Sequence, residues 1–257
     1  MTQQPRDYLY GGEYAAERAR LAAIEALWDP GSESLLDELG LGVGSRCLEV
    51  GAGGGSLVEW MVGRGAAVTA VDIDTRFIEH LASGSVDVRR LDIRSDDLPP
   101  GGFDFVHARL VLEHLADRRS ILRKLVGVLR PGGWIVIEDY EFSCYSLGDQ
   151  PYLDATVRAF FGVMELAGFD RTFGRRVVNE LAEAGLTDVR GEGRTRIIDA
   201  QSPGFEFFKL SFENIREQVV ATGALTVADA DATAARFADQ SMRIFTPIVM
   251  AGIGRRA

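Results

Sequence analysis

Residues 47–56 read Cys47-Leu48-Glu49-Val50-Gly51-Ala52-Gly53-Gly54-Gly55-Ser56, an apolar run that enters a glycine-rich turn. A second apolar run, 67–71, ends at Asp72, 21 residues after Gly51. Glycines let a ligand approach the backbone at a strand-to-helix turn, and an acid one strand away accepts hydrogen bonds from a ribose. The stretch therefore predicts a nucleoside-binding crevice.

Composition limits the class of protein and its partners. The chain has 257 residues, 46% of them apolar, and a formal net charge of −10. This charge repels a nucleic-acid backbone, so no nucleic-acid partner is expected. No leader-like segment and no apolar run of about 18 residues occurs, which predicts a cytoplasmic protein without a membrane partner. The two cysteines, Cys47 and Cys144, lack metal-ligand spacing, and no metal is predicted.

Short apolar strands alternate with helices from residue 46 to residue 137. This alternation predicts βαβ units and a parallel sheet with helices on both faces. The final segment, 242–252, reads as an antiparallel last strand in which Pro247 favours a bulge or an edge position. We therefore expect an α/β, Rossmann-like, seven-stranded, mostly parallel sheet. Strands are predicted at 46–50, 67–72, 86–91, 103–107, 134–137, 188–198 and 242–252, and core helices at 54–64, 75–82, 117–129 and 175–184.

Two regions depart from this alternation. An amphipathic helix at 13–29 precedes the first strand, and we expect residues 1–45 to form a segment that covers the cofactor site. Aromatic residues crowd the region after Tyr140, where helices are predicted at 151–166, 204–221 and 227–239. They favour packing of a helical cap, with some of them lining a site for an apolar substrate. The prediction is one domain, a core at 46–257 with cap insertions at about 140–175 and 200–241.

Glu49 indicates which type of nucleoside cofactor the crevice binds. A glycine pattern alone is weak evidence, and a purely structural turn is an open alternative. Ser56 occupies the third-glycine position of the dinucleotide fingerprint, and an acid near the turn disfavours a pyrophosphate. S-adenosylmethionine (SAM) carries an ammonium and a sulfonium, which an acid at the end of the first strand attracts. A nicotinamide-dependent oxidoreductase is the less favoured interpretation.

At this point the chain resembles the class I SAM-dependent methyltransferases. Six motifs occur in that family's order between residues 46 and 140, whereas the resemblance outside this core is loose. They are Glu49-x-Gly51-x-Gly53-x-Gly55, Val71-Asp72-Ile73-Asp74, Leu91-Asp92-Ile93 before Leu98-Pro99, Phe103-Asp104-Phe105-Val106-His107, Leu112-Glu113-His114-Leu115-Ala116-Asp117, and Leu129-Arg130-Pro131-Gly132-Gly133-Trp134.

The resemblance implies roles for the residues that bind SAM. Glu49 would hold the ammonium, although a strand-end acid satisfied by nearby backbone is an alternative. Asp72 would accept hydrogen bonds from both ribose hydroxyls. Asp92 would accept from the adenine amino group, or instead form a local turn. Gly51, Gly53 and Gly55 would pass under the methionine and ribose. Ile73, Ile93 and His107, which lie within the motifs, would also contact SAM, and Tyr8 or Tyr14 of the N-terminal segment would bind its methionine end.

Methyl transfer requires alignment of the acceptor and exclusion of water, and needs a general base only for a weakly acidic acceptor. His107, His114 and Asp139 are the catalytic candidates, because each lies at a predicted strand end or helix entry. A structural hydrogen bond is the alternative role for both histidines. The substrate-binding candidates are Arg109, Tyr140, Phe142 and Tyr145.

The sequence thus predicts a methyltransferase that acts on an O, N or C atom of a small, partly apolar metabolite, of the kind made in secondary metabolism. A protein that binds SAM without transferring its methyl group is the alternative. A homodimer is a further possibility.

Overall fold

A computed structural model describes residues 14–257, which divide by their contacts into two compact units. The sheet unit comprises residues 28–143, 170–194 and 248–257. The helical unit comprises residues 144–169 and 195–247 together with residues 14–27. Helix α1 (Tyr14–Glu38) contributes residues to both units.

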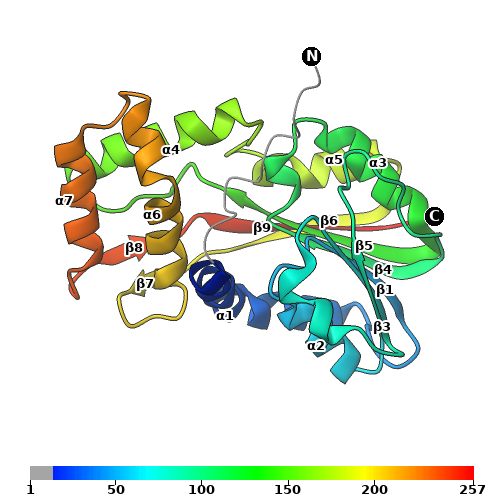
Figure 1. Ribbon diagram of the computed structural model, residues 1–257. Helices are drawn as coiled ribbons and strands as arrows, with labels where there is room; N and C mark the ends of the chain where they lie inside the picture. Colours follow the sequence, from blue (N-terminus) through cyan, green and yellow to red (C-terminus); the bar gives the residue numbers. More distant parts are fainter. Residues whose placement is uncertain (1–13) are drawn as a thin grey trace, which may run out of the picture. The chain divides into compact units, whose positions relative to one another are not determined.

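A seven-stranded sheet forms the centre of the sheet unit, in the order β3-β2-β1-β4-β5-β9-β6 (Figure 1). Strands β1 to β5 pair in parallel, and β9 is antiparallel to both of its neighbours. This confirms the predicted Rossmann-like sheet. The strands are β1 (Arg46–Val50), β2 (Ala67–Asp72), β3 (Val86–Arg90), β4 (Phe103–Arg109), β5 (Leu129–Glu141), β6 (Thr187–Arg194) and β9 (Ile248–Arg255).

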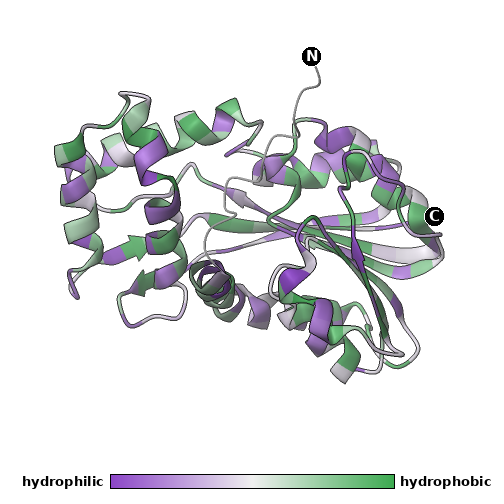
Figure 2. Ribbon diagram, in the orientation of Figure 1, coloured by the Kyte–Doolittle hydropathy of each residue, from purple (hydrophilic) through white to green (hydrophobic). Residues whose placement is uncertain are grey.

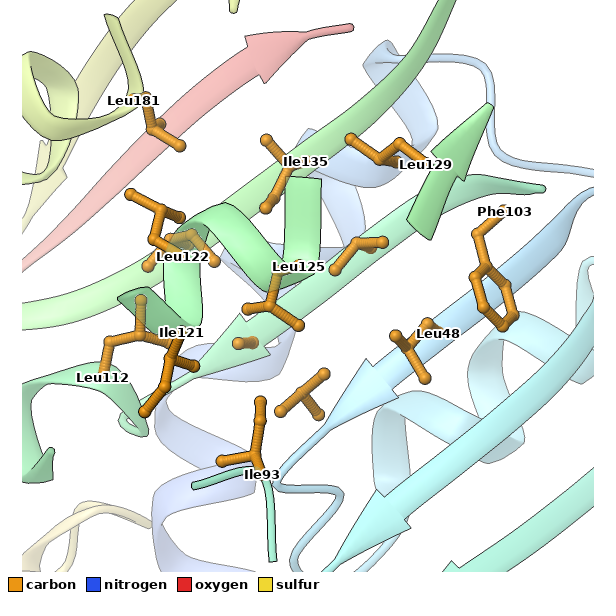
Figure 3. Close-up of a cluster of buried hydrophobic side chains, with 14 of the residues drawn as sticks. Leu48, Ile93, Phe103, Leu112, Ile121, Leu122, Leu125, Leu129, Ile135 and Leu181 are labelled. Atoms are coloured by element: carbon orange, nitrogen blue, oxygen red, sulfur yellow. The ribbon is translucent and has the colours of Figure 1, made fainter. Parts of the chain in front are cut away.

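One face of the sheet packs against α3 (Arg118–Val128) and α5 (Val177–Glu183). Leu48 and Ile135 of the sheet meet Leu122 and Leu125 of α3 in this core, as Figure 3 shows. All four side chains are buried, which removes most of their apolar surface from water.

The other face packs against α2 (Ser56–Gly63) and the second half of α1. Cys47 lies in this layer, and burial raises the pKa of its thiol far above the ordinary value. The helices around the sheet carry both hydrophilic and hydrophobic residues, as expected of helices with one buried side (Figure 2).

The helical unit consists of α4 (Pro151–Leu166), α6 (Phe205–Ala221), α7 (Val227–Phe237) and a two-stranded sheet, β7 (Ile197–Asp199) with β8 (Arg243–Phe245). Its aromatic side chains pack on one another, which makes them the core of this unit. Ring pairs include Phe161 with Phe169, Tyr145 with Phe208, and Phe212 with Phe237. No helix within residues 14–257 has the length and apolar character needed to cross a bilayer.

Four predicted elements differ most from the structure. Helix α1 continues through Pro30 to Glu38, because Leu35 and Leu36 extend its buried side. The predicted helix 75–82 is instead two short 3-10 turns, η1 (Thr75–Phe77) and η2 (Glu79–Leu81).

The two remaining differences concern strands. The predicted strand 188–198 is divided between β6 and β7, and the segment 242–252 between β8 and β9. Pro247 separates the latter two because it has no N–H to donate to a ladder. Strand β9 also lies inside the sheet rather than at its edge.

Candidate functional site

The glycine loop after β1 adopts backbone conformations that other residues rarely take. Gly51, Gly53 and Gly55 have φ angles of 69°, 56° and 91°. A Cβ at Gly51 would collide with Val111, and one at Gly55 would lie 2.6 Å from Leu81. The loop lies where the strand order reverses between β1 and β4, the position at which open α/β sheets bind ligands.

Asp72 joins the end of β2 to this loop. Its carboxylate accepts hydrogen bonds from the Gly53 N–H at 2.8 Å and the Asp74 N–H at 2.9 Å. Burial raises its pKa, and these backbone donors oppose that effect. A carboxylate has about four acceptor positions, so Asp72 can also accept from ribose hydroxyls. The neighbouring Ile73 side chain is exposed.

Asp92 forms a local turn after β3. It accepts from the Arg94 N–H at 3.0 Å and from the Arg94 guanidinium, which lowers its pKa. The turn interpretation is confirmed, whereas contact with an adenine stays a prediction. Ile93 is buried in the core beside it.

Glu49 and His107 meet beneath the glycine loop, on the face of the sheet that α1 covers. They are register partners in β1 and β4, and His107 Nδ1 lies 2.7 Å from Glu49 Oε2. His107 Nε2 lies 3.1 Å from Oε2 of Glu138 on β5. All three side chains are buried. Glu49 is therefore satisfied by a side chain rather than by backbone, and both nitrogens of His107 are engaged.

The network continues into α1 and β6. Ser32 of α1 donates a hydrogen bond to Glu138, which also forms an ion pair with Arg194 of β6. Arg109, a substrate-binding candidate, donates to Ser32 Oγ at 2.9 Å and to Asp29 at 2.6 Å. In this structure Arg109 thus ties β4 to α1. Sequence reasoning expects Glu138 or Asp139, at the end of the fifth strand, to face the ligand. It does not pair Glu138 with His107, because only the strand register shows that these two share a face.

Asp139 points to the opposite face of the sheet. Its Oδ1 accepts from the N–H groups of Val111 and Glu113, at 3.0 and 3.4 Å, near the 3-10 turn η3 (Leu112–His114). Burial raises the pKa of Asp139 to about 8 and the pKa of Glu113 well above its usual range. Glu113 in turn accepts from the Tyr140 N–H at 2.7 Å. Asp139 is therefore a buried residue that holds η3 to β5.

His114, the last residue of η3, is more accessible. Its side chain is 28% exposed, and its Nε2 lies 3.6 Å from Oε1 of Glu113. It is at the carboxyl end of β4, on the ligand side of the sheet.

The aromatic candidates lie in different surroundings. Tyr140 is only 2% exposed, its hydroxyl accepts from Trp28 Nε1 at 2.7 Å, and its ring contacts Phe142 edge-on. Tyr145 belongs to the helical unit, where it stacks on Phe208. Tyr14 is 56% exposed, and Tyr8 lies outside the described residues.

Comparisons with known proteins agree on one family. A model described as a methyltransferase domain matches residues 48–137. Two similar relatives are named ubiquinone biosynthesis O-methyltransferase. The one from Thiobacillus denitrificans is 30% identical over 165 residues, and the one from Pseudomonas syringae pv. tomato 32% identical over 166 residues. Each match covers 56% of this chain and 69% of the relative.

A third relative of the same name, from Chromobacterium violaceum, is 34% identical over 123 residues. The match covers 45% of this chain and 51% of the relative, so the chain spans about half of that protein's length.

Solved structures resemble the whole chain at the level of the fold. The YcgJ protein of Bacillus subtilis superposes with a TM-score of 0.60 at 13% identity, covering 89% of this chain and 99% of that one. The Haemonchus contortus phosphoethanolamine N-methyltransferase 2, solved in complex with SAM, also gives 0.60, at 17% identity, covering 98% of this chain and 59% of that one.

The chain therefore belongs to the class I SAM-dependent methyltransferases. Its cofactor is SAM, the methyl donor of that family. The glycine loop and Asp72 fit this molecule, because the loop brings bare backbone to the crevice beside a carboxylate that has acceptor positions for a ribose.

Proposed function

We propose that the protein methylates a hydroxyl oxygen of a small, partly apolar molecule, with S-adenosylhomocysteine as the second product. The observation that carries the proposal is similarity to enzymes named O-methyltransferases, in an alignment that extends beyond the shared methyltransferase domain. The biosynthetic role in those names favours a phenolic ring as the acceptor, because ubiquinone carries its methoxy groups on a ring.

The SAM-binding roles are assigned to residues at the ends of β1, β2 and β3. The glycine loop would pass under the donor, Asp72 would hold the ribose, Asp92 the adenine and Glu49 the ammonium. The carboxylates also give this edge of the sheet a negative potential that attracts a cation. Bound SAM supplies a methyl group on a positively charged sulfur, which leaves as a neutral thioether when the acceptor oxygen bonds to the methyl carbon.

A hydroxyl acceptor needs a base, and the geometry favours His114. His107 is fully buried with carboxylates at both ring nitrogens. Asp139 is also fully buried and accepts from backbone. His114 is the accessible member of the three candidates, so we assign it the proton that leaves the hydroxyl.

The test uses SAM labelled on its methyl group with separate panels of phenols, aliphatic alcohols and amines. The proposal expects labelled product from a phenol. His114→Gln should lower kcat by about 100-fold and flatten the rise of kcat with pH, while the Kd for S-adenosylhomocysteine stays within about two-fold. The matched control is His80→Gln, in the short turn η2.

Two outcomes would overturn the proposal. One is labelled product from amines alone. The other is tight binding of S-adenosylhomocysteine with no labelled product from any panel, which would indicate a protein that binds SAM without transferring its methyl group.

A further inference from the structure

A buried polar network extends from Glu49, the residue proposed to bind the ammonium, across the neighbouring strands. Glu49, His107 and Glu138 come from three adjacent strands and stand side by side on one face of the sheet. Ser32 of α1 and Arg194 of β6 complete the network through Glu138. Each carboxylate would be costly to bury without these partners.

The hydrogen-bond inventory of this network requires an additional proton. Carboxylates only accept, and a neutral imidazole has a single N–H, yet both ring nitrogens of His107 lie within hydrogen-bond distance of a carboxylate. For both contacts to be hydrogen bonds, the network must hold one proton more than a neutral histidine supplies.

The direction of the Glu49 carboxylate is set from one side by His107. Within residues 14–257, the His107 ring is the side chain that donates to Glu49, and it reaches Oε2 only. Glu49 stands two residues before Gly51, at the entrance to the glycine loop. Because His107 holds Oε2 in place, it also sets the direction in which Oε1 of Glu49 points.

We propose that His107 is a positioning residue for SAM, holding the Glu49 carboxylate in the orientation that receives the ammonium of the donor. Glu138 and Arg194 hold His107 in turn. The inference rests on the proposed role of Glu49 in the cofactor site and adds a residue that acts through it.

Two substitutions separate the two contacts of the ring. The side-chain amide nitrogen of asparagine stands close to the position of Nδ1, so His107→Asn can keep the donor to Glu49. The amide nitrogen of glutamine stands close to Nε2, so His107→Gln can keep the donor to Glu138 and lose the one to Glu49. Both variants have an uncharged side chain at position 107, and each leaves one buried carboxylate without a donor. We therefore expect the two variants to destabilise the folded protein by similar amounts.

The measurement is calorimetric titration of each purified variant with S-adenosylhomocysteine, with thermal unfolding to show that it is folded. We expect His107→Gln to raise Kd by at least about 10-fold and His107→Asn by less than about three-fold. In turnover, His107→Gln should raise the KM for SAM and leave kcat at saturation nearly unchanged.

Equal Kd values for folded His107→Asn and His107→Gln would overturn the inference, whether both variants bound S-adenosylhomocysteine weakly or both bound it tightly. Glu49→Gln distinguishes this failure from a failure of the site assignment. If Glu49→Gln binds as tightly as the parent protein, the ammonium site itself is wrong. If it binds weakly while the two His107 variants agree, the site stands and the positioning role falls.

Discussion

Asp72 has a structural role that the hydrogen bonds show and a proposed role in ligand binding. It accepts from Gly53 and Asp74, so it fixes the glycine loop before any ligand arrives. The proposed role of this acid toward the ribose followed from its spacing after the first strand, since an acid at a second strand end is a local sequence signal. The hydrogen bonds that Asp72 accepts from the Gly53 and Asp74 N–H groups could not be predicted in this way, because they depend on how the loop folds back over β2.

Asp72→Asn should weaken S-adenosylhomocysteine binding by about 10- to 100-fold. The amide keeps the shape of the side chain but loses the charge-assisted hydrogen bonds to ribose hydroxyls. Calorimetric titration measures the change. Asp87→Asn is the matched control, because Asp87 is exposed on the neighbouring strand β3, where it forms an ion pair with Arg89. A Kd for Asp72→Asn equal to that of the control would remove Asp72 from the site.

The end of β5 shows what the element scale adds. Glu138 and Asp139 are adjacent in sequence, and the alternation of a strand sends them to opposite faces. Glu138 joins the network with His107, while Asp139 holds η3. The sequence predicted that one of this pair would face the ligand, but which face each residue takes depends on the register with β4 and β9.

Asp139 makes stability depend on pH in a defined direction. Its pKa is raised by burial to about 8, whereas an unfolded aspartate titrates near about 3.9. Between these values the folded protein holds a proton that the unfolded chain has lost, so stability falls as pH rises through this window. The free energy of unfolding should fall by up to about 1.4 kcal/mol per pH unit in the parent protein, and Asp139→Asn should remove this slope. Urea unfolding between about pH 5 and about pH 8 measures the slope.

Glu141→Gln is the control for this slope. Burial alone would raise the pKa of Glu141, but hydrogen bonds from Arg175 and Ser143 lower it to about 2. Its contribution is present above the unfolded value of about 4.3 and is lost only as pH falls towards about 2. Glu141→Gln should therefore show the same dependence of unfolding free energy on pH as the parent protein between about pH 5 and about pH 8. If Asp139→Asn kept the same dependence of unfolding free energy on pH as the parent protein, Asp139 would not be its source.

At the scale of the whole molecule, the assigned SAM-binding residues Glu49, Asp72 and Asp92 all belong to the sheet unit. A ligand that binds only the folded state stabilises it by about 2.7 kcal/mol at 100 times its Kd. For a unit of this size, S-adenosylhomocysteine should raise Tm by roughly 5–10 °C.

Differential scanning calorimetry with and without S-adenosylhomocysteine tests this shift. NADH at the same concentration is the control and should leave Tm unchanged, because Glu49 disfavours a pyrophosphate at the loop. A shift with NADH and none with S-adenosylhomocysteine would contradict the assignment of the cofactor.

The sequence by itself determined the class of the fold, the glycine loop and the acids at the strand ends. These depend on local signals, namely hydrophobic period, glycine spacing and residues next to a turn. Only the tertiary structure decided that Glu49 meets His107, that Arg109 binds α1 and that Asp139 is buried. Such partners are separated by tens of residues in the chain, and they are brought together by strand order and register, which no local pattern encodes.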